Sequence, residues 1–501
     1  MRLSKSLPFL ILLFALVLRL IALNIRPLWY DEAFAVLFAE KGFTAMLAGT
    51  LTPVAGVASD VHPIAYYTAL DFWMRAFGQS PFATRLLSVF LGLMTVAVTF
   101  AIGRRLFDGR AGAIGMLIVA ISPFHVYYSQ ETRMYAALGL FCSLVVLFFL
   151  RAVVRANDWR LEIGDWAGVA VSAAAAMYMQ NLAAFFLLAF GLSALSRPKV
   201  LAKVAMAGAA AFVLWLPWFL NLPGQFAKLQ QAYWVTRPNF VTLLQTALVY
   251  HTGEELVEAR LLLPLALFTA IILPVFLFWK FFRQRHQVTT QHALWLTVLA
   301  VGTPLLLFLA SLYQPVYIQR ALLPAALMYS IALGWLLTQK AMPLLIRILL
   351  GGLLGFTAIA GLWAHTTFAQ FPRPNFQEAV AFLRGQAEPG DLILHSNKLT
   401  FFPMHFYDRD LVQAFLADPP GSGSDTLALP TQEVLGLLAV NDVEARAQGV
   451  GRVWFVIFDR AVEEYAMEEH PHLRWLESHY TRKSERRVDD LAVYEFVKAG
   501  P

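Results

Sequence analysis

Long apolar runs are the feature that most limits what this chain can fold into. A helix needs about 20 mostly apolar residues to cross roughly 30 Å of hydrocarbon. Of the 501 residues, 58% are hydrophobic and only 14% are charged, which excludes an ordinary cytosolic enzyme, a disordered protein and a nucleic-acid binder. Eleven runs meet this length or nearly so: 7–23, 83–103, 111–128, 135–150, 166–180, 182–195, 203–220, 260–279, 292–312, 320–338 and 343–363.

The distribution of basic residues among the loops predicts the orientation in the membrane. Loops on the cytoplasmic side carry an excess of Lys and Arg. With the N-terminus inside, the short inside loops hold 16 basic residues and the longer outside loops hold seven. No small-residue cleavage site follows the first run, so we expect it to be retained as a span. Eleven spans then place the C-terminus outside.

Charge divides the chain into two parts. Residues 1–365 carry 26 Lys and Arg against 13 Asp and Glu, whereas residues 366–501 carry 13 against 20. Short apolar runs that alternate with helical patterns in the second part are typical of a small α/β unit. The sequence therefore predicts an all-α polytopic membrane bundle of about 11 helices, with a long first outer loop at 24–82, followed by an extracytoplasmic α/β domain. The elements expected in that domain are a helix at 375–386, strands at 391–395, 452–458 and 491–497, and a helix at 461–479.

Two adjacent carboxylates, Asp31 and Glu32, follow the first span directly. Such a pair is costly to desolvate near a membrane unless it is paired, so it indicates a functional site. Burial and mutual repulsion would raise the pKa of one carboxyl toward the range of a general base. The alternative is a solvated acid pair at the start of a helix.

His62 lies in the first outer loop, between Asp60 and Pro63. Asp60 could orient the His62 ring for binding. Alternatively, both side chains could cap the helix that follows, since proline is favoured at a first helical position.

The outside turn between the third and fourth spans is rich in polar and aromatic residues. Arg133 could bind a phosphate through its planar fork, or form a plain interfacial ion pair with Glu131. Arg320 precedes the tenth span on a face where basic residues are disfavoured, and an anionic lipid headgroup would explain it. The candidate binding residues of the turn are Tyr128, Gln130, Glu131, Arg133 and Tyr135.

A carboxylate pair and two arginines at one face suit sugar transfer from a polyprenyl phosphate. That reaction needs a base for the acceptor hydroxyl and cations for the departing phosphate. The metalloprotease, P-loop, nucleophile-elbow and dinucleotide-binding motifs do not occur. The single Cys142 allows no disulfide, and the scattered acids suggest no metal-ligand set.

The chain resembles the polytopic glycosyltransferases of the C superfamily, in the branch of the protein O-mannosyltransferases, lipid A aminoarabinose transferases and RgtA/B/C/D-like enzymes (glycosyltransferase family 39-like). The C-terminal part of the chain is also similar to the extracytoplasmic tails of bacterial members. The resemblance is carried by Asp31-Glu32, His62-Pro63, the segment 129–135 after Ser122-Pro123, Arg320 to Pro324, Glu388-Pro389-Gly390-Asp391 and Arg452-Val453-Trp454.

The resemblance implies a polyprenyl-phosphate-linked sugar donor, a lipid, glycan or protein acceptor, and inversion at the anomeric carbon. It makes Asp31 the catalytic base with Glu32 in support, and it places Arg133 and Arg320 near the donor phosphate. A divalent cation stays open, because oligosaccharyltransferase relatives use one and this branch generally does not. The chain departs from the family where His62-Pro63 is followed by Ile and where Arg320 is followed by Ala.

The resemblance and the charge bias together imply a multi-pass protein of the plasma (inner) membrane. Its active site and C-terminal domain are expected on the extracytoplasmic side. The main alternative is a transporter or lipid flippase, because intramembrane charges also mark translocation paths. Transporters tend to show two repeated halves, and the sequence shows no such symmetry.

Overall fold

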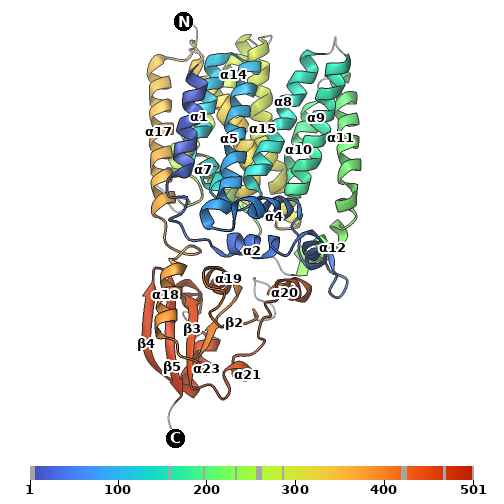
Figure 1. Cartoon of the computed structure of the whole chain (residues 1–501). Coiled ribbons are helices and arrows are strands. Elements are labelled where there is room, and N and C mark those ends of the chain that lie inside the picture. Colours follow the sequence, from blue (N-terminus) through green and yellow to red (C-terminus); the bar gives the residue numbers. More distant parts are fainter. Residues whose placement is uncertain are drawn as a thin grey trace.

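Apolar helices stand side by side in one bundle, and a small domain with a β-sheet lies beyond one end of it (Figure 1). The computed structural model describes residues 6–155, 159–195, 198–231, 234–255, 262–284, 287–418, 426–465 and 470–498. The bundle helices are α1 (Leu7–Leu20), α5 (Pro81–Leu106), α6 (Gly109–Ile121), α7 (Pro123–Ser129), α8 (Tyr135–Val154), α9 (Trp159–Met179), α10 (Ala183–Ser193), α11 (Pro198–Phe219), α14 (Leu263–Gln284), α15 (Val288–Tyr313), α16 (Leu323–Thr338) and α17 (Leu344–Thr367).

Each of the eleven predicted runs is mainly helical within its described residues (260 and 261 lie outside them), although not all are long enough to span a membrane by themselves. Within the described residues, seven helices have the length and composition to cross a membrane, or up to eight if the bent pair α6 and α7 is one span. The helices α1 and α10 are apolar but shorter. These helices indicate a multi-pass membrane protein, and the count of eleven spans stays a prediction.

Helix α16 forms the centre of the bundle. Of the most apolar 18-residue stretch within Gln319–Thr338, which is α16 with the turn before it, 89% is buried, against 28% for α14 and for α17, whose apolar side chains face outward. Small residues let α16 approach α6 closely. A Cβ atom on Gly334 would lie 2.5 Å from the backbone nitrogen of Gly115, so α16 tolerates no side chain at this contact.

A bend of 63° separates α6 from α7. Pro123 begins α7, and the Ser122 side chain accepts a hydrogen bond from the His125 amide. Since proline cannot continue the hydrogen-bond pattern of α6, carbonyl groups at the end of that helix lack partners. The buried Arg19 donates to two of them, the oxygens of Ala120 at 3.1 Å and Val119 at 3.4 Å.

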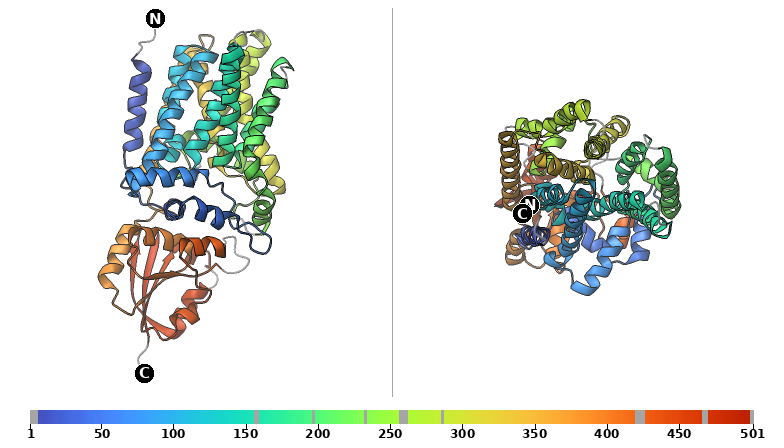
Figure 2. Two further views of the ribbon diagram at one scale, coloured as in Figure 1. Left: turned by 45° about the vertical axis from the view of Figure 1, so that its right-hand side comes forward. Right: turned by 90° about the horizontal axis from the view of Figure 1, so that it is seen from above.

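Short helices lie across the end of the bundle that faces the sheet domain, and Figure 2 shows them between the two parts. One of them, α2 in the first outer loop, carries the predicted carboxylate pair Asp31 and Glu32. The N- and C-termini lie at opposite ends of the molecule (Figure 1). The connecting helices are α2 (Tyr30–Ala39), α3 (Phe43–Leu51), α4 (Ala65–Phe77), α12 (Leu222–Gln231), α13 (Phe240–Thr252) and the 3-10 turn η2 (Gln319–Leu322).

The sheet domain has a mixed five-stranded sheet in the order β2-β1-β3-β5-β4. Strand β1 runs parallel to β2 and β3, whereas β5 runs antiparallel to β3 and β4. Successive residues of β3 alternate between two cores, one against α18 and α19 and the other against α21 and α23. The elements are α18 (Phe376–Gln386), β1 (Leu392–His395), α19 (Lys398–Tyr407), β2 (Gln413–Phe415), α20 (Leu429–Leu435), α21 (Val443–Ala447), β3 (Arg452–Phe458), α22 (Asp459–Glu463), α23 (Pro471–His479), β4 (Tyr480–Val488) and β5 (Leu491–Lys498).

The predicted elements of this domain are largely confirmed, with two differences. The helix expected at 461–479 is wrong as a single element, because α22 ends at Glu463 and α23 begins anew at Pro471; residues 466–469 lie outside the described residues. Strands β2 and β4 were not expected. All side chains of β4 between its two end residues are exposed, so the strand shows no apolar alternation.

The sheet domain packs directly on the first outer loop. The Phe402 ring of α19 lies 5.7 Å from the Tyr30 ring at the start of α2, and the Tyr407 hydroxyl accepts a hydrogen bond from the Leu28 amide at 2.7 Å. In α20, Thr431 donates to the carbonyl of Gly49 in α3 at 2.7 Å. Helix α2 is therefore held between the bundle and the sheet domain.

Candidate active site

Asp31 lies in the first turn of α2, where the helix dipole favours a negative charge. Arg320 donates from Nη1 to Asp31 Oδ2 at 3.2 Å, and Arg133 Nε lies 3.9 Å from the same oxygen. Burial works to raise the pKa of Asp31, but Arg133, Arg320 and His62 outweigh it, so the pKa lies below its ordinary value. The carboxyl group is thus held ionised between two guanidinium groups.

Arg133, one of the two arginines beside Asp31, is positioned by residues of the first outer loop. Arg133 donates to the Tyr67 hydroxyl at 3.0 Å, and its Nη2 lies 3.5 Å from His62 Nε2. His62 Nδ1 donates to Asp60 Oδ1 at 2.9 Å, which leaves Nε2 free to accept from Arg133. Asp60 therefore orients the His62 ring. The helix α4 starts later, after Ile64, and has no side-chain cap.

Glu32 has no exposed surface and is saturated with hydrogen bonds. Its Oε1 accepts from Arg85 Nε and from the Thr132 amide, both at 2.9 Å. Its Oε2 accepts from Arg85 at 2.7 Å and from Arg373 at 2.9 Å. Burial opposes the charge, but Arg85 and Arg373 overcome it and hold the pKa of Glu32 well below its ordinary value. With two hydrogen bonds accepted by each oxygen, Glu32 has no acceptor site left for a substrate proton.

Glu131 pairs with Arg373. Its Oε1 accepts from Trp29 at 2.9 Å and from Arg373 at 3.2 Å. Burial, together with the charge of Glu32, raises the pKa of Glu131 above its ordinary value, although Arg373 counteracts this. The interfacial pair with Arg133 that the sequence left open is not formed, because Arg133 turns toward Asp31 instead.

The remaining turn residues fall into two groups. The Arg320 guanidinium lies 5.3 Å from the centre of the Tyr135 ring, and Tyr128 packs on Tyr135 at 4.9 Å, so both rings line the arginine side of the site. Gln130 lies apart from Asp31. Its amide donates to the carbonyls of Arg19 and Ile21 at 2.9 and 2.8 Å and thereby ties the end of α1 to the turn.

Several donors around Asp31 have no hydrogen-bond partner in the described part of the chain. They are the buried Nε groups of Arg133 and Arg320 and the hydroxyl of Tyr135. Buried donors are normally satisfied, so each exception calls for an explanation, and a bound ligand is one. Charged N–H donors gathered in this way match the oxygens of a phosphate group. Over the same described residues, no cluster of three or more His, Cys, Asp or Glu side chains could hold a metal ion.

Sequence reasoning missed two arginines of the site, Arg85 and Arg373. Arg85 lies at the outer end of the predicted span at 83–103. Basic residues are disfavoured on that face, so the reasoning that singled out Arg320 applies to Arg85 as well. Arg373 carries no such signal, because it lies in the connection between α17 and the sheet domain (also called the soluble domain), where basic residues are common.

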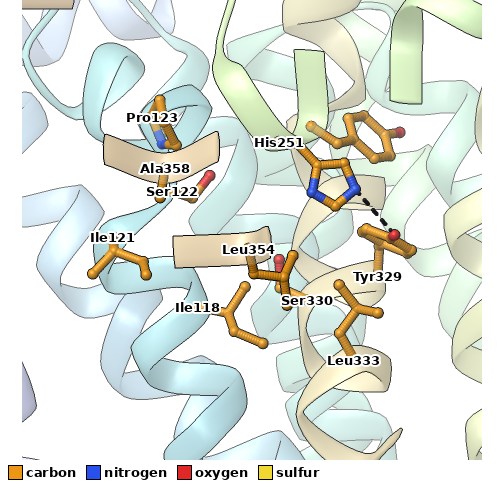
Figure 3. Close-up of a pocket in the computed structure, with 11 residues that line it drawn as sticks. Ile118, Ile121, Ser122, Pro123, His251, Tyr329, Ser330, Leu333, Leu354 and Ala358 are labelled. Atoms are coloured by element: carbon orange, nitrogen blue, oxygen red, sulfur yellow. Dashed lines mark hydrogen bonds between the residues drawn. The ribbon is translucent and has the colours of Figure 1, made fainter. Parts of the chain in front are cut away.

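Two cavities lie away from these residues. One of about 20 Å³ adjoins the bend between α6 and α7, and His251 Nε2 lies 3.2 Å from the Tyr329 hydroxyl there (Figure 3). The other, of about 430 Å³, is apolar and is lined by α8, α9, α10 and α11. None of the predicted site residues lines either cavity.

Sequence comparison matches part of the chain to one family. Residues 61–220 match the family model of the dolichyl-phosphate-mannose-protein mannosyltransferases. This stretch includes His62 and Arg133 but neither Asp31 nor Arg320. No curated protein matches the chain significantly.

Solved structures with the same fold cover the whole chain. ArnT from Cupriavidus metallidurans in the apo state is similar with a TM-score of 0.63 at 15% identity, over 98% of each chain. The same protein bound to undecaprenyl phosphate gives a TM-score of 0.61 at 15% identity, over 100% of each chain. The oligosaccharyltransferase from Archaeoglobus fulgidus gives 0.54 at 12% identity, over 96% of this chain and 73% of its own. The resemblance to the polytopic C-superfamily glycosyltransferases is therefore confirmed in the fold.

Proposed function

We propose that this chain is a membrane-embedded glycosyltransferase that moves a sugar from a polyprenyl-phosphate donor to an acceptor hydroxyl. The observation that carries the proposal is the carboxylate of Asp31 between Arg133 and Arg320, whose buried Nε groups make no hydrogen bond within the described residues. The fold shared with ArnT, which binds undecaprenyl phosphate in one structure, supports the choice of donor.

In the proposed reaction, the acceptor oxygen attacks the anomeric carbon from the face opposite the phosphate. As the new C–O bond forms, the bond to the phosphate oxygen breaks and its electron pair stays on the phosphate, so the configuration inverts. Arg133 and Arg320 stabilise the charge that develops on the leaving group. Asp31 takes the proton of the acceptor hydroxyl. A carboxylate of low pKa can do so because the hydroxyl becomes acidic as its oxygen bonds to the sugar.

Donor binding would also activate the base. In the free protein, Arg133 and Arg320 lower the pKa of Asp31, whereas burial acts to raise it. A phosphate group bound to both arginines would offset their charge, and burial would then raise the pKa of Asp31. The base would become stronger once the donor is in place.

The other predicted residues have supporting roles in this proposal. His62 orients Arg133, and Tyr128 and Tyr135 line the donor side beside Arg320. Glu32, Glu131 and Gln130 hold the turn and the start of α2. The site lies at the end of the bundle near the soluble domain, opposite the N-terminus, and the charge bias of the loops assigns that end to the extracytoplasmic side (Figure 1).

The test is sugar transfer by the purified protein in lipid vesicles, from a panel of radiolabelled polyprenyl-phosphate sugars, with nucleotide sugars as control donors. We expect turnover of a lipid-linked donor and its loss in Arg133→Ala. The matched control is Arg75→Ala, since Arg75 is 64% exposed and pairs with Asp71 of its own helix. Turnover of nucleotide sugars alone, or an active Arg133→Ala variant, would contradict the proposal.

The transporter alternative makes a different prediction in the same experiment. It predicts movement of the lipid-linked sugar across the vesicle membrane with no transfer to an acceptor. The fold comparisons favour the transferase.

A further inference from the structure

The connection between the last bundle helix and the soluble domain enters the candidate site. Residues 368–375, here called the strap, join α17 to α18. Arg373 of the strap is only 3% exposed. Its guanidinium donates to Glu32 Oε2 at 2.9 Å, to Glu131 Oε1 at 3.2 Å and to the Tyr127 hydroxyl at 3.0 Å.

Arg373 is also enclosed by two aromatic rings. Its Cζ atom lies 5.2 Å from the centre of the Trp29 ring and 5.3 Å from that of Tyr127. Hydrogen bonds to two carboxylates and a hydroxyl, together with two nearby rings, hold the guanidinium in place. Because the side chain is held in this way, a shift of the Arg373 backbone would also shift Glu32 and Glu131.

That backbone is fastened to the soluble domain at both ends of a five-residue stretch. The Phe371 amide donates to Asp490 at 3.1 Å, and the Asn375 amide donates to Asp489 at 2.8 Å. Both aspartates lie in the turn between β4 and β5. The backbone on both sides of Arg373 is therefore attached to the soluble domain, while its side chain reaches the candidate site.

The partners of Arg373 are the neighbours in sequence of the reacting groups. Glu32 follows Asp31 in α2, Trp29 precedes it by two residues, and Glu131 precedes Arg133 by two residues. A single side chain thus links the segment that carries the proposed base to the segment that carries a proposed phosphate-binding arginine. Without it, Glu131 would lose its cation and two buried carboxylates would repel each other.

We propose that Arg373 is a positioning residue through which the soluble domain sets the distance between Asp31 and Arg133. This inference rests on the proposed function for its kinetic consequences. The soluble domain then forms part of the catalytic unit. It is not simply a cover or an acceptor-binding module.

The first experiment compares transfer kinetics of Arg373→Ala, Arg373→Lys and wild type. Because Arg373 contacts only supporting residues, we expect Arg373→Ala to lower kcat by about 100-fold with KM for the donor little changed. Lysine should restore only part of the rate, since it cannot bridge two carboxylates. Added guanidinium ion should recover part of the activity of Arg373→Ala. Unchanged kcat, or a loss confined to KM, would overturn the proposal.

Arg409→Ala is the matched control. Arg409 also joins the soluble domain to the first outer loop, through Glu40 and Gln79. It is 41% exposed, and its partner Glu40 follows the end of α2 opposite to Asp31. We expect normal transfer. Loss of activity in this variant equal to that of Arg373→Ala would mean that docking as such, and not Arg373, is what matters.

A second measurement does not depend on activity or on a stable Arg373→Ala protein. Replacing Asp489 and Asp490 together by Ala leaves Arg373 in place but frees the strap. Hydrogen exchange should then become faster at 29–33 and 130–133 in this variant and not in Arg409→Ala. Unchanged exchange would overturn the positioning role. Failure of the wild type to use any polyprenyl-phosphate sugar would refute the proposed function alone, and the exchange result would still decide this inference.

Discussion

Replacing Glu32 by Gln is the perturbation that separates structural support from chemistry most clearly. Each oxygen of Glu32 accepts two hydrogen bonds, one pair from Arg85 Nε and the Thr132 amide, the other from Arg85 Nη2 and Arg373. Glutamine offers one oxygen and one NH2 group. Whichever way its amide turns, the NH2 group faces two donors, and two buried hydrogen bonds are lost.

The expected loss of stability follows from these two lost hydrogen bonds. An unsatisfied buried donor costs about 1–3 kcal/mol, and removing one partner of a buried ion pair costs about 3–5 kcal/mol in total. At roughly 2 °C per kcal/mol for a chain of this size, the apparent melting temperature should fall by roughly 6–10 °C. Asp31→Asn removes the charge but keeps an oxygen that can accept from Arg320, and Asp31 is 16% exposed, so this variant should cost less, about 1–2 kcal/mol.

The assay is thermal unfolding of the detergent-solubilised protein, followed by the monodisperse fraction after heating, with transfer activity measured in parallel. We expect Glu32→Gln to melt much lower and to keep some activity below its melting temperature. Asp31→Asn should melt near the wild type and lack activity. Equal melting temperatures for the two variants, or an active Asp31→Asn next to an inactive but stable Glu32→Gln, would refute the assigned roles.

Two further predictions address the electrostatics and the packing of the site. Arg320→Gln should move the acid limb of the kcat/KM profile to higher pH, because Arg320 lowers the pKa of Asp31 and the base acts only when ionised; an unmoved limb in the pH profile would contradict this. Gly92→Ala should destabilise the protein by about 1–3 kcal/mol, since its Cβ atom would lie 2.2 Å from Ser129 Oγ. Gly351→Ala, whose Cβ atom would meet nothing within 4 Å, is the control in the same melting assay and should be neutral.

The candidate residues that the structure brings together share one property. Asp31, Arg133 and Arg320 each stand at the same end of a predicted span, so the bundle brings them together whatever the details of its packing. The apolar strand β3 could be predicted for a similar reason, because a run of buried residues fixes the type of the element locally.

What the sequence did not predict depends on contacts between distant segments. Arg85 lies 53 residues from its partner Glu32, and Arg373 lies 341 residues from it. Nothing in the local pattern around Arg373 distinguishes it from other basic residues of the soluble domain. Strand β4 lies at the sheet edge with charged side chains exposed, so its place in the sheet comes from pairing with β5.

The central claim is that the Asp31 carboxylate takes the acceptor proton, and one measurement tests it most directly. Transfer of radiolabelled sugar from a polyprenyl-phosphate donor is compared between wild type and Asp31→Asn in the same lipid vesicles. We expect the rate to fall by about 10²–10⁴-fold, the usual contribution of a general base, while the donor still binds to Arg133 and Arg320. An Asp31→Asn variant that transfers sugar at the wild-type rate would contradict the account.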